Sequence, residues 1–185
     1  MHDCGRSSLG LLLCLVVGGC SGLPSRGAIA TDGPLTAGSG EAHYCLPVAQ
    51  GASITFGHDV FRSSGDEQLS VLDVELEDAD GVTVQQAVFV PLLTTDYIGT
   101  YDRFPPPMAD LRRSGLAESW ARRQAVGRKP IVLDTAFPHE LVLELKATAP
   151  RATATGITVT YEAGDDRFTV TTDTALELVS EAPCA

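Results

Sequence analysis

The sequence lacks the motifs that mark the common families of enzymes and metal-binding proteins. It has no HExxH or other ligand spacing of histidines, no GxSxG, no phosphate-binding glycine loop and no Ser/Lys signature. No apolar run reaches the roughly 20 residues that a membrane-spanning helix needs. Nucleic acid is a poor partner for a chain with a net charge of −11. We therefore expect a non-catalytic protein without a cofactor or a metal.

The first 20 residues have the features of an export signal. Arg6 supplies positive charge, and residues 9–17 form an apolar core of the length found in signal peptides. Residues 15–20 read Leu-Val-Val-Gly-Gly-Cys and resemble a bacterial lipobox. The resemblance implies that residues 1–19 are a signal peptide, that Cys20 is lipidated, and that the protein is anchored on the outer face of the plasma membrane. The alternatives are an ordinary secretory signal and a retained membrane anchor.

The expected signal determines which cysteines remain available for a disulfide. Cys4 and Cys14 would leave with the signal peptide and Cys20 would carry the lipid, so Cys45 and Cys184 would remain in an oxidising compartment. We expect them to form a disulfide that ties the two ends of the domain together. A metal pair or a reactive thiol is the weaker alternative, because the chain has no CxxC pattern.

The remaining chain divides into a tether and one domain. Residues 20–44 are mostly Gly, Ser, Ala, Thr and Pro, a composition typical of a flexible tether. Residues 45–185 have the length of a single domain that can bury its own core.

Within this domain the dominant period is two. In residues 72–77 leucine and valine alternate with acids, residues 78–81 have turn chemistry, and residues 82–85 resume the alternation, which predicts a hairpin over residues 70–90. Further short strands are predicted at residues 53–56, 130–134, 141–146, 157–162, 168–171 and 176–179. The sequence therefore predicts a mainly β fold, an antiparallel immunoglobulin-like β-sandwich with one short helical insertion.

The insertion is predicted over residues 108–126, where Leu111, Leu116 and Trp120 form a short apolar stripe. Residues 103–129 hold seven bases against two acids, a balance of +5, so the rest of the chain sums to −11 − 5 = −16. The candidate surface for an anionic partner consists of Arg112, Arg113, Arg122 and Arg123. Such a partner would be lipid headgroups, a cell-wall polymer or an acidic protein face. The alternative is a solvated helix whose arginines pair with the acidic strands.

Two further groups of residues are weaker candidates. His58 and Asp59 are adjacent and are therefore a candidate acid–base pair. Neighbouring residues of a strand, however, point to opposite faces of the sheet. Glu77, Asp78 and Asp80 offer carboxylates to calcium, yet they lack the EF-hand spacing and hairpin turns are commonly acidic. We expect a surface histidine and a turn, respectively.

The order of short motifs along residues 45–184 resembles a group of uncharacterised actinobacterial secreted or lipid-anchored proteins. The motifs are Cys45-Leu46-Pro47, Ile54-Thr55-Phe56-Gly57, Gly65-Asp66, Val71-Leu72-Asp73-Val74, Gly81, Trp120, Tyr161 and Cys184. This resemblance implies the disulfide and the sandwich, and it brings no activity. The leading hypothesis is a lipid-anchored binding or assembly module of the cell envelope. A small-ligand-binding lipoprotein and an envelope enzyme are the alternatives.

Overall fold

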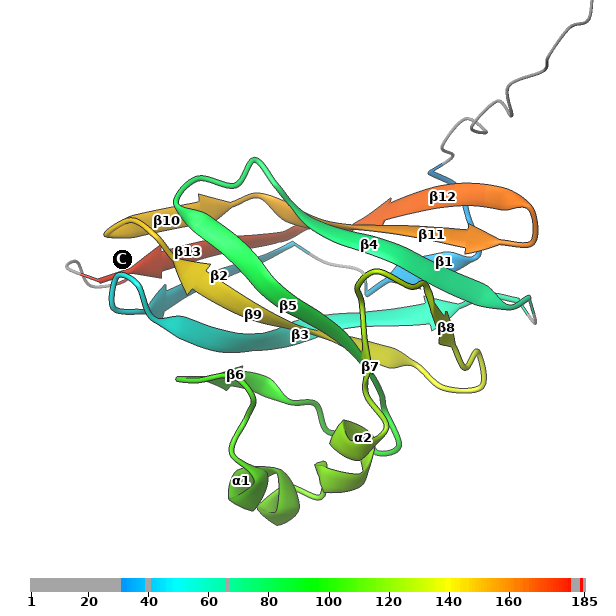
Figure 1. Ribbon diagram of the computed structural model, residues 1–185, viewed down its shortest axis with the longest axis horizontal. Helices are drawn as coiled ribbons and strands as arrows, with labels where there is room; N and C mark the ends of the chain where they lie inside the picture. Colours follow the sequence, from blue (N-terminus) through cyan, green and yellow to red (C-terminus); the bar gives the residue numbers. More distant parts are fainter. Residues whose placement is uncertain (1–30, 39–40, 66, 181–183, 185) are drawn as a thin grey trace, which may run out of the picture.

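Alternating apolar and polar residues build strands that stack in two layers, and the computed structural model describes residues 31–38, 41–65, 67–180 and 184 (Figure 1). The strands of the first layer are β1 (Leu35–Ala37), β3 (Ser53–Ser63), β5 (Val82–Pro91), β6 (Gly99–Tyr101), β7 (Gln124–Ala125) and β9 (His139–Ala147). They form one antiparallel sheet in the order β1–β3–β9–β5–β7, with β6 also paired to β3.

The second layer consists of two sheets. Its strands are β2 (Ala42–Pro47), β4 (Leu69–Glu77), β8 (Ile131–Leu133), β10 (Arg151–Ala154), β11 (Gly156–Ala163), β12 (Asp166–Thr171) and β13 (Thr174–Val179). One sheet has the order β12–β11–β4–β8 and the other has the order β10–β13–β2. All pairs are antiparallel except β13 with β2, which is parallel.

The strand order confirms the predicted immunoglobulin-like sandwich. In that fold, strands A, B, E and D form one sheet and strands C, F and G form the other. Here β1–β3–β9–β5 takes the A–B–E–D positions, and β12–β11–β4 takes the G–F–C positions. The parallel pairing of β2 with β13 is the departure from a purely antiparallel arrangement.

The core lies between the two layers. Phe56, Phe61 and Leu143 of the first layer and Tyr161 of the second are at most 1% exposed. The phenol oxygen of Tyr161 accepts the backbone N–H of Leu35 at 3.1 Å, so this buried hydroxyl is satisfied. Burial of side chains from every long strand is what holds the layers together.

Two predictions about the N-terminal half are wrong. The boundary at residue 45 falls inside the sandwich, because β1 and β2 begin earlier and pair with β3 and β13. The predicted hairpin over residues 70–90 is not a paired hairpin: β4 pairs with β11 and β8, whereas β5 pairs with β9 and β7. The turn at residues 78–81 therefore carries the chain from one layer to the other.

The predicted helical insertion lies between β5 and β9, but it is two short helices and not one. These are α1 (Met108–Arg113) and α2 (Ala117–Ala121). Gly115 has φ = 76°, the left-handed conformation that ends many helices. The N–H of Leu116 bonds to the Leu111 carbonyl at 2.8 Å and that of Gly115 to the Arg112 carbonyl at 3.3 Å. This Schellman motif ends α1 and starts α2 one residue after Leu116.

Candidate functional site

The insertion is fixed to the outer face of the first layer by a second apolar cluster. Leu111, Leu116 and Trp120 are at most 3% exposed, as predicted for the docked stripe. They pack with Val88, Val90, Ile98 and Val142 of the sheet and its adjoining loop. Phe104 contributes an edge-to-face contact with Trp120 at a centroid distance of 5.9 Å. The insertion thus has a core of its own, separate from the core between the layers.

A buried carboxylate on β9 binds the loop before β6 and the first residue of β6, and the sequence did not predict it. Glu140 is 0% exposed, and its carboxylate oxygens accept the backbone N–H of Ile98 at 2.9 Å and that of Gly99 at 3.3 Å. Gly57 on the neighbouring strand leaves the space for this carboxylate, because a Cβ there would lie 2.5 Å from its Oε1 atom. The one feature of the sequence that could have indicated this burial is that Glu140 lies on the same outward face of β9 as the apolar Val142.

Burial raises the pKa of Glu140 from 4.5 to about 7, although the N–H donors of Ile98 and Gly99 lower it. The folded protein therefore holds a proton here between pH 4.5 and 7 that the unfolded chain has released. Stability from this group is fully present below pH 4.5 and is lost as the pH rises toward 7.

Glu140→Gln should therefore stabilise the protein at pH 8 and leave it nearly unchanged at pH 4. At one pKa unit per 1.36 kcal/mol, the gain at pH 8 is at most about 3 kcal/mol. Urea unfolding of both proteins at the two pH values measures it. A loss of stability at pH 8 would show that the ionised carboxylate is needed for its bonds to Ile98 and Gly99.

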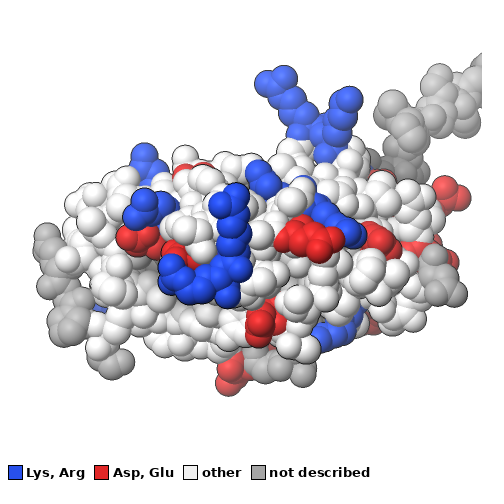
Figure 2. All heavy atoms as spheres, turned by 90° about the horizontal axis from the view of Figure 1, so that it is seen from below, with Lys and Arg blue, Asp and Glu red and all other residues white. Residues whose placement is uncertain are grey.

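The four arginines of the candidate surface lie on the insertion, but they do not form one equivalent set. Figure 2 looks onto the face that carries the helices, where basic side chains gather in the middle with acidic side chains on both sides. Arg113 pairs with Asp110 at 3.4 Å and Arg122 pairs with Glu118 at 2.6 Å, all with exposed side chains. Among the described residues, Arg112 has no ion pair. None of the four pairs with an acid of the strands in that part of the chain.

Arg123 differs from the other three because it is bound to the insertion itself. Its guanidinium lies 4.6 Å from the centre of the Trp120 ring and donates to the Trp120 carbonyl at 2.9 Å. It therefore covers a core residue and satisfies a carbonyl at the end of α2. This side chain supports the structure and is less free to bind a partner.

Arg123→Ala should consequently lower the free energy of unfolding by about 1 kcal/mol, whereas Arg112→Ala should change it by less than about 0.5 kcal/mol. Thermal unfolding of the two variants beside the parent protein tests the difference. Equal effects would show that the contact with Trp120 does not matter.

The weaker candidates of the sequence analysis have other partners. The Asp59 carboxylate accepts the Thr174 hydroxyl at 2.6 Å, whereas the His58 ring bonds the Thr100 hydroxyl at 2.9 Å, so the two are not joined. Glu77 and Asp78 accept hydroxyls of Thr158 and Thr155, respectively. Among the described residues, no group of three or more His, Cys, Asp or Glu side chains is arranged to hold a metal ion.

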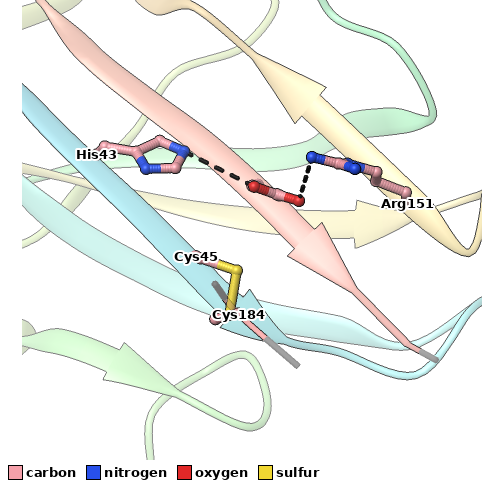
Figure 3. The surroundings of a disulfide bond; sticks show 5 residues. His43, Cys45, Arg151 and Cys184 are labelled. Atoms are coloured by element: carbon pink, nitrogen blue, oxygen red, sulfur yellow. Dashed lines mark ion pairs between the residues drawn. A yellow bond between two sulfur atoms is a disulfide. The ribbon is translucent and has the colours of Figure 1, made fainter. Parts of the chain in front are cut away.

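The predicted disulfide is present. Cys45 on β2 is bonded to Cys184, with their Cα atoms 5.5 Å apart (Figure 3). On the same face, Glu177 of β13 pairs with Arg151 at 2.8 Å and lies 3.8 Å from the His43 ring. The bond closes a loop with a sequence separation of 139 and joins Cys184, which follows the last strand, to β2. Cys20 lies outside the described residues.

Two hollows of the described surface lie away from the insertion. One of about 510 Å³ is lined by Glu41, Ala42, His43, Thr155, Asp173 and Ala175, and one of about 480 Å³ lies between β1 and β12. Neither contains Glu140 or the arginines of the insertion. Within the part of the chain that is described, no helix is long and apolar enough to cross a membrane.

Comparison with known proteins adds a distant structural likeness. No protein-family model matches the chain, and no curated protein matches it significantly. Among solved structures it is similar to the ASH/PapD-like domain 7 of human CEP192, at 8% sequence identity and a TM-score of 0.39. That likeness covers 97% of this chain and 100% of the other. The strand order described above is what identifies the immunoglobulin-like arrangement.

Proposed function

We propose that this protein is a lipid-anchored, extracytoplasmic and non-catalytic module that binds an anionic partner at the cell envelope through the insertion between β5 and β9. The observation that carries the proposal is the state of Arg112, Arg113 and Arg122. All three are exposed, and among the described residues the acids that pair with them are Asp110 and Glu118 of the insertion itself.

Such exposed pairs contribute little to stability, with a typical value of about 0–1 kcal/mol. In the described part of the chain the three arginines pair with no acid of the strands, which is the pairing that the alternative explanation of the charge balance requires. The guanidinium groups remain available to exchange Asp110 and Glu118 for an anionic group of a partner. The second apolar cluster supports this role, because it holds the two helices in place while their charged sides face solvent.

The envelope location rests on the lipobox resemblance at residues 15–20 and is supported by the disulfide between Cys45 and Cys184. We predict that the mature protein starts at Cys20 with a lipid on it. Intact-mass measurement of the protein purified from membranes tests this, and Cys20→Ala should abolish the lipid mass. An unmodified N-terminus at any other residue would contradict the proposal.

Binding through the insertion can be tested by site-specific photo-crosslinking in native membranes. A photoreactive residue at Ser114, which is exposed between the helices, should capture a partner in a reaction that added salt suppresses. The matched control is Asp165, which is exposed in the turn between β11 and β12 in the other layer. Equal capture at the two positions would remove the insertion as the binding surface.

A further inference from the structure

We infer that the anionic partner of the insertion is the phospholipid headgroup layer of the membrane that carries the anchor, so that α1 lies against the membrane surface. This inference rests on the proposed function, because it names the partner of the same surface. It is argued from the apolar side chains that accompany the arginines.

The exposed side of α1 combines an apolar and a basic side chain. Met108 and Arg112 stand four residues apart, so they lie on the same side of the helix, one turn from each other. Met108 is 42% exposed, and Arg112 is exposed without an ion pair among the described residues. A soluble polyanion would contact the arginine and gain nothing from the methionine. The boundary between headgroups and acyl chains accepts both.

Two of the exposed large apolar residues belong to the chain that leads into and begins α1. Tyr97 lies just before β6 and Met108 begins α1, whereas the other two in the described structure, Val132 on β8 and Phe137 after it, lie outside the helices. Tyr97 is 55% exposed. An exposed tyrosine suits a membrane surface, because tyrosine is enriched where membrane meets water.

The charge of the insertion suits the membrane, although the domain as a whole is acidic. A Lys or Arg close to an anionic membrane strengthens binding about fivefold, and the effect disappears beyond about 8 Å at physiological ionic strength. Because electrostatic attraction has such a short range, an acidic domain binds an anionic surface only through a face whose basic residues lie nearest to that surface. The insertion is that face, since residues 103–129 carry +5 and the rest of the chain carries −16.

The lipid on Cys20 and this surface would act together. Residues 21–34 join Cys20 to β1, and their fully extended length is at most about 50 Å. That length keeps the domain within reach of the membrane. The headgroups would be met at a high local concentration, so weak individual contacts suffice.

The test is amide hydrogen exchange of residues 108–121 in the full lipidated protein, reconstituted in vesicles. Exchange should be several-fold slower in vesicles that contain phosphatidylglycerol than in pure phosphatidylcholine vesicles. Arg112→Gln and Met108→Gln should each remove most of this protection. Arg62→Gln is the matched control: Arg62 is exposed on β3 without an ion pair among the described residues, and its loss should leave the protection unchanged.

Three outcomes would overturn the inference, and they separate it from the proposed function. Equal exchange in the two kinds of vesicle, together with capture of a protein at Ser114, would mean a protein partner and would leave the proposed function standing. Equal protection by soluble polyglutamate added to neutral vesicles would mean a polymeric or acidic protein partner. No protection and no capture at Ser114 above that at Asp165 would overturn both.

Discussion

Replacing Cys45 and Cys184 together by serine should lower the free energy of unfolding by about 5 kcal/mol. The reason is that the bond closes a loop with a sequence separation of 139, and in the chain-entropy model such a cross-link removes about that much free energy from the unfolded state. Since whole domains are stable by roughly 5–15 kcal/mol, the reduced protein should be close to unfolding at 37 °C.

Urea unfolding of the parent protein and the double serine variant measures the difference. A reductant should bring the parent to the stability of the variant and should not change the variant. A shift of less than about 1 kcal/mol would show that the unfolded chain is already compact enough to make the cross-link unimportant.

The second large effect is expected for Trp120→Ala, which should cost about 3–5 kcal/mol within the insertion. Trp120 is 3% exposed and contacts Phe104 and Arg123, so its removal would leave a cavity in a cluster that has few other members. Because this cluster is separate from the core between the layers, the loss should unfold the insertion before the sandwich.

Trp120 is the single tryptophan, so its fluorescence reports on the insertion in the parent protein while far-ultraviolet circular dichroism reports on the strands. In Trp120→Ala, hydrogen exchange should be fast over residues 108–121 and slow in β3 and β9. Trp120→Phe is the control that keeps an aromatic ring in place. Uniformly faster exchange across both regions would mean that the insertion and the sandwich unfold as one unit.

The strands were predictable because their side chains alternate between a buried and an exposed face. The stretches at residues 141–146 and 157–162 became β9 and β11 for this reason. The disulfide was predictable because the expected signal peptide and lipidation leave Cys45 and Cys184 as the two remaining cysteines. The change of layer at residues 78–81 was not, because alternation shows which face of a strand is buried and not which strand lies beside it.

The candidate site was predictable only in part. The stripe of Leu111, Leu116 and Trp120 correctly indicated a docked segment, and Gly115 carried the signal for the break between the helices. Glu140 was missed because an acid on the outer face of a strand is ordinarily solvated. Its carboxylate accepts the backbone N–H groups of Ile98 and Gly99, which lie 42 and 41 residues away in sequence, and alternation along β9 does not show that they are its neighbours.

The central claim is that the exposed arginines of the insertion serve binding and not folding. It is tested most directly by measuring two quantities on the triple variant Arg112→Gln, Arg113→Gln and Arg122→Gln, which leaves Arg123 in place. These quantities are the thermal unfolding midpoint and the photo-crosslinking yield at Ser114 in membranes. We predict an unchanged midpoint and a yield that falls by at least tenfold, because each basic residue contributes about 1 kcal/mol near an anionic surface. A lowered midpoint with an unchanged yield would contradict the claim.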